Sequence, residues 1–260
     1  MGRGRLEITY IGGPTAVFEW GEFRLLTDPT FDPPGGEYKT GPVLLKKTAG
    51  PALSPASLGR IGTVLLSHDH HYDNLDHAGR AFLPNADRVL TTPSGAERLG
   101  GRAIGLLNWQ SIDIPAAGGP ALRVTGTPAR HGPASLDRGP VTGFVIAFAD
   151  APDGPVYISG DTVWYEGAAE VARRFDIRTA VLFMGAARVP AVGPDALTMT
   201  AADGIEAARA FSEATIVPLH YEGWAHFTES RQQIARAFEA AGLGSRVRWM
   251  EPGATIAVAR

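Results

Sequence analysis

The ten residues 67–76, "SHDHHYDNLD", constrain this chain more than any other stretch. They contain three histidines and three aspartates, and they follow the apolar run Val64-Leu65-Leu66 directly. Because the chain has seven histidines in all, three in one loop indicate a shared purpose. Imidazole and carboxylate groups gathered this closely are typical of a site for zinc, manganese or iron. We therefore expect a fold that brings further ligands to this loop.

Three other apolar runs are each followed by a group that can bind a metal. The pairs are 122–125 with His131, 156–159 with Asp161, and 216–219 with His220. Taken singly, each group has a simpler interpretation, such as a surface histidine, a turn or capping aspartate, or a partly buried histidine. In α/β folds, however, strand ends meet at one edge of the sheet, where ligands bind. Four such strand ends together predict one metal site.

The composition excludes several classes of protein. The net charge of −3 and the lack of a basic block argue against a nucleic-acid partner, and the absence of cysteine excludes disulfides and thiolate metal sites. We find no signal peptide and no apolar stretch of about 18 residues, so we expect no membrane span and a cytoplasmic location. A chain of 260 residues suits a single domain, 1–260, that acts on a small molecule. The sequence leaves a homo-oligomer open.

The order of strands and helices predicts a layered α/β protein. Strands are predicted at 6–11, 15–20, 23–27, 63–67, 88–91, 122–125, 141–148, 156–159, 180–183, 215–219 and 255–259. The stretch "EWGEF" predicts a tight hairpin with Gly21 in its turn. Helices are predicted from Thr200 to about Phe211, from Thr228 to Gly242, and from about Glu166 to Phe175. The segment Pro29–Gly59 is predicted to be a long loop, either a functional rim or a plain surface excursion.

These motifs resemble those of metallo-β-lactamase-fold hydrolases. The resemblance is to the branch that contains the ascorbate-6-phosphate lactonase and the phospholipase D acting on N-acyl-phosphatidylethanolamines. "YIGGPTAVFEWGEFRLLTDPTF" is similar to that branch's opening hairpin, "SHDHHYDNLD" to its metal loop, "PARHG" to its next histidine, "SGDT" to its bridging aspartate and "PLHYEGWAHF" to its last histidine. The motifs span nearly the whole chain in the family's order. The resemblance implies a four-layer αββα sandwich with a two-metal site at the edge between its two sheets.

The metal loop departs from the family's pattern, His-any-His-any-Asp-His. Matched from the preceding strand, His68 and His70 fit, but Tyr72 then stands in the place of the aspartate. Matched from the following helix, "DNLD" fits the family's Asp-His-Leu-Asp, with Asn74 replacing a histidine and one residue inserted after His68. We favour this second alignment, which makes His71 the second histidine of the motif. His70 and His71 remain competitors for one ligand position.

The resemblance also implies ligands for one or two divalent metal ions, with zinc expected and manganese or iron as alternatives. The first metal would be held by His68, His131 and one of His70 and His71; the second would be held by Asp73 and His220, with Asp161 bridging both. Since Asn74 offers only a neutral amide oxygen, we expect the second site to be weak or to hold a harder metal. Asp76 and His77 are expected to be solvated or to support the ligands.

A bound divalent metal lowers the pKa of water from 15.7 to about 7, which makes hydroxide available at neutral pH. With Asp73 and Asp161 as catalytic residues, the sequence predicts a metal-dependent hydrolase that uses metal-bound hydroxide on a small ester, lactone or phosphodiester. Lys46 and Lys47 either attract a phosphate or are solvated charges. The residues predicted to wall the substrate pocket are Trp164, Tyr221, Trp224 and His226.

Two other function classes remain open at this stage. An iron-dependent oxidoreductase on the same fold is one alternative. The other is a degenerate member that binds a ligand without turnover, and Asn74 is the feature that favours it. Cleavage of β-lactams is less well supported, because the motifs resemble the lactonase branch.

Overall fold

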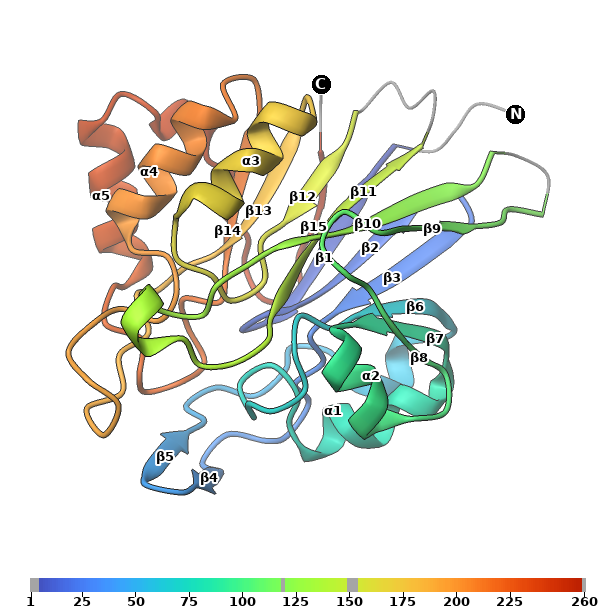
Figure 1. The fold of residues 1–260 in the computed structure, drawn as a ribbon, viewed down its shortest axis with the longest axis horizontal. Coiled ribbons are helices and arrows are strands. Elements are labelled where there is room, and N and C mark those ends of the chain that lie inside the picture. Colours follow the sequence, from blue (N-terminus) through green and yellow to red (C-terminus); the bar gives the residue numbers. More distant parts are fainter. Residues whose placement is uncertain (1–4, 118–119, 149–153, 259–260) are drawn as a thin grey trace.

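The structure is a computed structural model that describes residues 5–117, 120–148 and 154–258. Its centre is a pair of β-sheets (Figure 1). The first has the strand order β15-β1-β2-β3-β6-β7-β8. Its members are β1 (Glu7–Gly12), β2 (Thr15–Trp20), β3 (Phe23–Thr27), β6 (Ile61–Leu65), β7 (Ala86–Thr91), β8 (Ala103–Gly105) and β15 (Thr255–Ala257).

The second sheet has the strand order β14-β13-β12-β11-β10-β9. Its members are β9 (Ser111–Ile114), β10 (Leu122–Pro128), β11 (Thr142–Phe148), β12 (Val156–Ile158), β13 (Thr179–Phe183) and β14 (Thr215–Leu219). Strands β12, β13 and β14 run parallel, so their carboxyl ends lie at one edge of this sheet. This is the edge at which Asp161 and His220 follow their strands.

Both faces of each sheet are apolar because both are covered. Ile8 and Tyr10 of β1 face the core between the sheets, whereas Ile11 faces outward. In the same way Phe144 of β11 lies between the sheets and Val145 faces the helices. Side chains alternate in this way because neighbouring residues of a strand point to opposite faces. Strand β11 is therefore a nearly continuous apolar run, whereas β1 still alternates over its first half, where Glu7 is exposed and Thr9 is half-buried.

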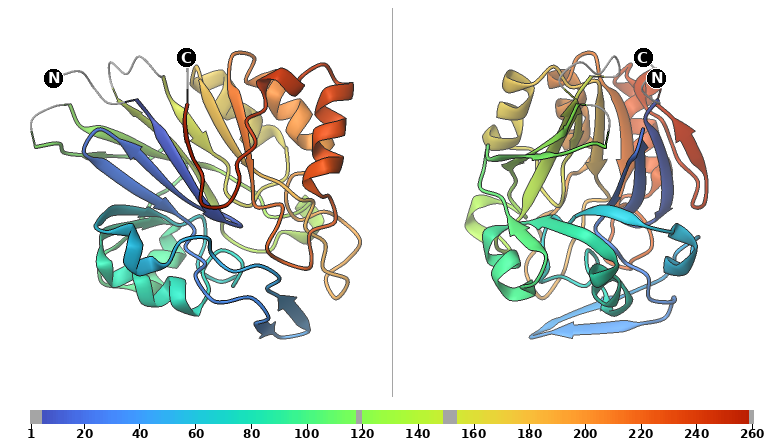
Figure 2. Two further views of the ribbon diagram at one scale, coloured as in Figure 1. Left: turned by 180° about the vertical axis from the view of Figure 1, so that it is seen from behind. Right: turned by 90° about the vertical axis from the view of Figure 1, so that its right-hand side faces the viewer.

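Helices cover the two outer faces (Figures 1 and 2). The core outside the first sheet contains Phe82 of α1 (His77–Phe82), with Leu99 of α2 (Pro93–Leu99) packed against it. The core outside the second sheet takes residues from α3 (Glu166–Arg174), α4 (Ala201–Ala210) and α5 (Arg231–Ala240). The layers are thus helix, sheet, sheet and helix, which confirms the predicted αββα sandwich. No helix in the described ranges is long and apolar enough to cross a membrane.

The predicted strands are all present, with ends shifted by up to three residues. The predicted end of the last strand, Ala259, lies outside the described residues. The hairpin prediction is confirmed, since Trp20 pairs with Phe23 across a turn in which Gly21 has a φ of 62°. Short strands β8 and β9 and helix α2 were not predicted.

Two of the three predicted helices begin where expected. Thr200 caps α4 in a capping box with Asp203, and α3 begins at Glu166. The prediction of Thr228 as the cap of α5 is wrong, because Ser230 accepts from Gln233 N and closes its own capping box. The hydroxyl of Thr228 instead donates to the carbonyl of Ala186 at 2.7 Å.

The predicted loop over 29–59 contains regular structure. Strands β4 (Glu37–Thr40) and β5 (Val43–Lys46) form a separate two-stranded hairpin, and a 3-10 helix covers Pro55–Leu58. The hairpin extends from the body of the molecule at the lower left of Figure 1. The prediction of a long loop is therefore wrong for the residues of this hairpin and of the 3-10 helix.

Candidate metal centre

The four strand ends meet in one cluster of titratable side chains. Their ligand atoms form three groups, in each of which all atoms lie within 4.8 Å of one another. The groups are His68, His70 and His71; His68, His131 and Asp161; and Asp73, Asp161 and His220. The structure thus brings together all seven residues that the sequence predicted as ligands.

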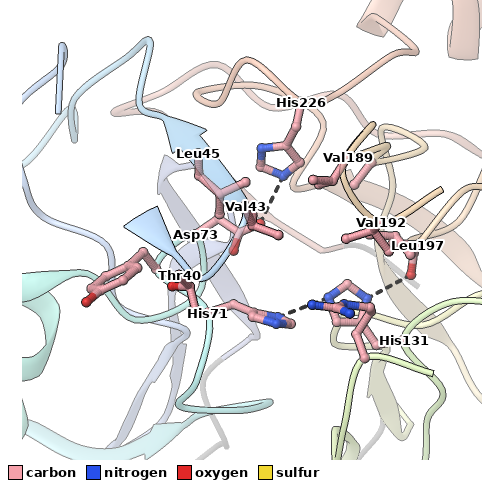
Figure 3. A pocket seen from close by; sticks show the side chains of 13 residues that line it. Thr40, Val43, Leu45, His71, Asp73, His131, Val189, Val192, Leu197 and His226 are labelled. Carbon is pink, nitrogen blue, oxygen red and sulfur yellow. Dashed lines mark hydrogen bonds and ion pairs between the residues drawn. The ribbon is translucent and has the colours of Figure 1, made fainter. Parts of the chain in front are cut away.

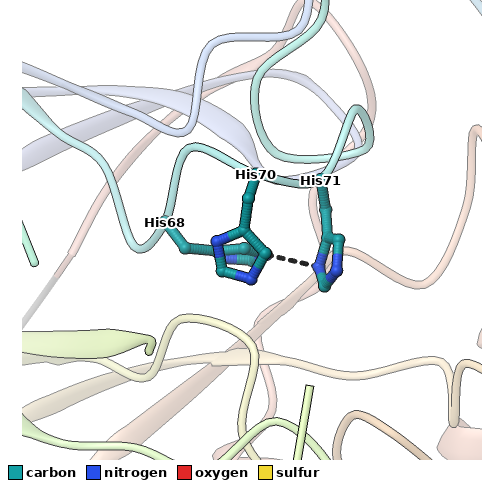
Figure 4. A group of neighbouring side chains, drawn as sticks. All are labelled: His68, His70 and His71. Atoms are coloured by element: carbon teal, nitrogen blue, oxygen red, sulfur yellow. Dashed lines mark hydrogen bonds between the residues drawn. The ribbon is translucent and has the colours of Figure 1, made fainter. Parts of the chain in front are cut away.

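Three ring nitrogens converge in the first part of this cluster. Nδ1 of His71 lies 2.9 Å from Nε2 of His68 and 3.2 Å from Nε2 of His131 (Figures 3 and 4). His68 follows β6, and only two residues separate His131 from the end of β10. The first sheet therefore fixes the position of the loop that carries His68, and the second sheet fixes that of the loop that carries His131.

Asp161 connects the two parts of the cluster. Its Oδ2 lies 3.6 Å from Nε2 of His131, and its Oδ1 lies 3.3 Å from Nε2 of His220. Asp73 completes the second part, with Oδ2 3.8 Å from the same nitrogen of His220. His220 has a φ of 56°, a left-handed backbone conformation that costs non-glycine residues free energy and is often found at functional sites.

His70 and His71 occupy different positions. His71 contacts both other histidines, whereas Nε2 of His70 lies 3.1 Å from the carbonyl oxygen of Arg138. Leu75 is buried in the core outside the first sheet, and Asp76 caps α1. The arrangement agrees with the alignment of the loop from its helix side.

Asn74 is buried beside the bridging carboxylate. Its Nδ2 lies 3.3 Å from Oδ1 of Asp161 and 3.4 Å from Oγ of Ser67. Its Oδ1 has no hydrogen-bond partner among the described residues. The amide therefore donates toward Asp161 in this arrangement, rather than offering its oxygen as the sequence interpretation assumed.

Asp28 is a buried residue beside the cluster that the sequence reasoning did not assign to the site. It follows β3, and its Oδ1 accepts hydrogen bonds from the backbone N (2.9 Å) and Oγ (2.5 Å) of Ser67. Oγ of Ser67 in turn lies 2.9 Å from Nδ1 of His68. Such contacts hold a metal-binding histidine in one orientation. The available signal was the same as at the other sites, a strand that ends in a ligand-type residue.

His131 is held in a similar way. Its Nδ1 lies 2.9 Å from the carbonyl oxygen of Leu197, which leaves Nε2 directed at the cluster. Because a carbonyl oxygen can only accept a hydrogen bond, Nδ1 carries a proton. Nε2 is therefore the nitrogen that could bind a metal.

The environment sets the protonation states that metal ligands require. Burial and the neighbouring histidines hold the pKa of His68 well below its usual range and lower the pKa of His71 to about 3. Burial opposes the charge of Asp73, but His226 and His220 outweigh it, so the pKa of Asp73 is well below normal. Burial likewise opposes the charge of Asp161, and His220 and His131 lower its pKa. Neutral imidazoles and ionised carboxylates are the forms that bind metals.

The cluster fits a divalent cation. Oδ2 of Asp161 and both ring nitrogens of His220 are buried, and no hydrogen bond reaches them from the described residues. Buried polar atoms are otherwise nearly always hydrogen-bonded. The carboxylates also raise the pKa of His220 despite its burial, which indicates an excess of negative charge at this point. A cation between these atoms would satisfy both conditions.

The cluster opens into a pocket of about 520 Å³, including its open mouth (Figure 3). His71, Asp73 and His131 lie on its lining, and most of the remaining lining is apolar. The other lining residues are Thr40, Val43, Leu45, Tyr72, Arg138, Ala187, Val189, Val192, Leu197 and His226. Because Val43 and Leu45 belong to β5, the hairpin does form part of the pocket's rim.

Comparison with known proteins identifies the family. Residues 23–221 match the Beta-lactamase superfamily domain. The chain belongs to this superfamily. A UPF0173 metal-dependent hydrolase from Pyrobaculum islandicum is 25% identical over 269 residues, which cover 97% of this chain and 100% of that protein.

Two solved structures show the same fold. Isothiocyanate hydrolase from Delia radicum gut bacteria has a TM-score of 0.83 and 23% identity, covering 97% of this chain and 99% of that one. A possible metal-dependent hydrolase from Veillonella parvula has a TM-score of 0.85 and 19% identity, covering 98% and 100%. This superfamily member is therefore a metal-dependent hydrolase of the metallo-β-lactamase fold. The narrower branch suggested by the motifs stays a prediction.

Among the residues predicted to wall the pocket of this hydrolase, His226 does so. It lies on the pocket lining, with Nε2 3.0 Å from Oδ2 of Asp73. Tyr221 instead lies in the core between the second sheet and its helices, where its ring contacts that of Trp249. Trp164 packs against the same core beside Phe211. Trp224 is buried behind the pocket wall, where its ring lies 5.2 Å from that of Tyr38. None of these three aromatics is among the residues that line this pocket.

Lys46, the last residue of β5, and Lys47, which follows it, do not line the pocket. Lys47 is buried, with Nζ 2.6 Å from Oδ2 of Asp76 and 5.3 Å from the centre of the Trp224 ring. Lys46 pairs with Glu37 at 2.6 Å. Neither lysine is thus placed to attract a phosphate, and Lys47 is not a solvated charge. Asp76 supports the loop, as expected, by accepting from Phe31 N, Asp32 N and Gly79 N as well as from Lys47.

Proposed function

We propose that this metal-dependent hydrolase cleaves a small ester or lactone with an apolar body. One observation carries the proposal: the cluster of histidine and aspartate side chains borders a pocket whose other walls are mainly Val, Leu and Ala side chains. Outside the metal cluster the lining carries one arginine and otherwise mainly apolar side chains, which favours a substrate with an apolar body over a phosphodiester.

We assign His68, His71 and His131 to one metal and Asp73 and His220 to a second, with Asp161 between them. The distances of 2.9–3.8 Å among their ligand atoms support this assignment, since atoms around one small cation lie this close together. The donor set of nitrogen and oxygen atoms suits zinc, with manganese or iron as alternatives.

A bound divalent metal would lower the pKa of water toward 7 and polarise the substrate oxygen. Asp73 lies on the pocket lining as an ionised carboxylate, so it can accept a hydrogen bond from the attacking water and orient it. His226 holds Asp73 through the 3.0 Å contact of its Nε2. The walls formed by Val43, Leu45 and Val189 would seat the apolar part of the substrate and exclude competing water.

A substrate panel tests the proposed function. It would comprise 4-nitrophenyl esters, γ- and δ-lactones, bis(4-nitrophenyl) phosphate and benzyl isothiocyanate, each assayed with zinc or manganese added. We expect ester or lactone turnover to exceed the other two. Turnover of the phosphate alone would contradict the proposal. Bound iron with visible absorbance and no hydrolysis would instead favour an oxidoreductase, and no turnover with any metal would favour a ligand-binding member.

Replacing His71 by Ala should lower the metal content, whereas replacing His70 by Ala should leave it near that of the wild type. The reason is that His71 contacts both other histidines, while His70 uses Nε2 on a backbone carbonyl. Elemental analysis of the two variants, purified without chelator, measures the difference. The opposite ranking would make His70 the ligand and overturn our alignment of the loop.

Asn74→His should tighten the binding of the second metal. Asn74 stands at the position of a family histidine, and imidazole is a far better donor for zinc than an amide. Zinc titration of metal-free protein by calorimetry should show two unequal steps in the wild type that converge in the variant. Two equivalent steps in the wild type would mean that another group already supplies the ligand. The contact of Asn74 with Asp161 predicts that part of any change comes from releasing this carboxylate.

A further inference from the structure

Arg138 is the one arginine or lysine among the described residues that line the pocket. It is half-buried. Its guanidinium makes no hydrogen bond or ion pair with the described residues, although Asp73 lines the same pocket. A guanidinium has five N–H donors and stays charged at all ordinary pH values. The guanidinium is therefore free to bind an acceptor that enters the pocket in place of water.

The backbone of Arg138 is fixed relative to the metal cluster. Its N–H donates to the carbonyl oxygen of His131 at 2.9 Å, and its own carbonyl oxygen lies 3.1 Å from Nε2 of His70. The backbone on both sides of the Arg138 Cα is thus held by a histidine, through the N–H by His131 and through the carbonyl oxygen by His70. This contact uses Nε2 of His70 and gives the residue a role in holding Arg138.

We propose that Arg138 binds a carboxylate at the end of the substrate away from the cleaved bond, and that His70 positions this arginine. The planar guanidinium matches a carboxylate with two parallel hydrogen bonds, which a point charge such as lysine does not provide. The pocket then has one polar anchor besides the metal cluster, together with apolar walls. The inference deepens the proposed function, because it names the substrate as an ester or lactone that carries a free carboxylate.

A binding comparison tests this recognition without any turnover. The ligands are octanoate and octanamide, which have the same length and differ in charge, titrated by calorimetry into the purified metal-loaded protein. We expect octanoate to bind more tightly than octanamide in the wild type, on the order of tenfold or more, since a hydrogen bond to a charged group has about this effect. Arg138→Gln should bring the two affinities together, and Arg138→Lys should retain part of the difference.

A kinetic comparison uses 4-nitrophenyl hexanoate and mono-4-nitrophenyl adipate, whose acyl chains have equal length. Arg138→Gln should lower kcat/KM for the adipate ester on the order of tenfold to a hundredfold, through KM, and leave the hexanoate ester unchanged. Arg88→Gln is the matched control, because Arg88 is also half-buried but lines a groove away from the cluster. If the protein hydrolyses neither ester, the proposed function fails, while the binding comparison still decides the role of Arg138.

The role of His70 has its own readout. His70→Ala should weaken the preference for octanoate with no loss of metal, and His70→Gln, which keeps an N–H donor, should restore it. An unchanged octanoate preference in Arg138→Gln would overturn the proposal. An equal loss of affinity for octanoate and octanamide in Arg138→Gln would also overturn it. The same would hold if Arg88→Gln lost the octanoate preference as Arg138→Gln does.

Discussion

Asp161→Asn is expected to reduce hydrolysis on the order of a thousandfold or more while leaving the fold intact. The carboxylate faces His131 with one oxygen and His220 with the other. It is the group that lies between both proposed metal positions. An amide of the same shape keeps the packing but removes the negative charge, and the loss of a group that acts with others in a metal site has large kinetic effects.

The measurement combines activity, metal content and circular dichroism on the same preparation. Asp87→Asn is a suitable control, because Asp87 is an exposed aspartate that pairs with Arg60 at 2.9 Å, away from the cluster. The control should keep full activity and metal content. Should Asp161→Asn behave like the control, Asp161 would be a turn residue after β12, and a mechanism with two metals would have to be abandoned.

The positions of the ligands could be predicted from the sequence because they depend on local rules. Each apolar run forms a strand, and the residue after a strand lies at the edge of the sheet. Gly160 shows how the local sequence fits this requirement. Its φ is 60°, and a side chain there would lie 2.7 Å from the carbonyl oxygen of Thr142 and 2.8 Å from Cβ of Ser67. Glycine allows the end of β12 to approach the metal loop, so the motif "SGDT" has a geometric reason.

The walls of the pocket could not be predicted in this way, because long-range contacts position them. Contacts with residues distant in sequence hold the β4–β5 hairpin at the pocket. Examples are the ion pair of Lys47 with Asp76 and the ring contact of Tyr38 with Trp224. Nothing in the local pattern of residues 37–46 specifies these partners. The apolar residues 187–197 on the opposite side of the pocket present the same difficulty.

The aromatic residues next to the ligands show why adjacency in sequence is a poor guide to a pocket. Tyr221 directly follows His220, yet it packs in the helix-side core against Trp249. The left-handed backbone of His220 turns the chain at this point, so Tyr221 enters the helix-side core and not the pocket. Asp28 shows the converse. It is 39 residues from Ser67 in sequence, but a parallel pairing of β3 with β6 places it directly behind the metal loop.

His131→Ala is expected to lower the affinity for the first metal by at least tenfold to a hundredfold, since even supporting contacts of metal ligands have effects of about this size. Nε2 of His131 lies 3.2 Å from Nδ1 of His71, and its Nδ1 is held by the carbonyl oxygen of Leu197. Alanine removes one of three ring nitrogens directed at the same point.

His77→Ala provides the matched control for that loss. His77 follows the metal loop directly, but it is exposed and its ring stacks beside Tyr38 and Tyr72 at 5.7 and 5.1 Å. The His77→Ala variant should retain the metal content of the wild type when both variants are purified without chelator and subjected to elemental analysis. Equal metal content in the two variants would contradict the assignment of His131. Circular dichroism separates loss of a ligand from loss of the fold: if His131→Ala keeps the wild-type spectrum while its metal content falls, the missing nitrogen itself accounts for the change.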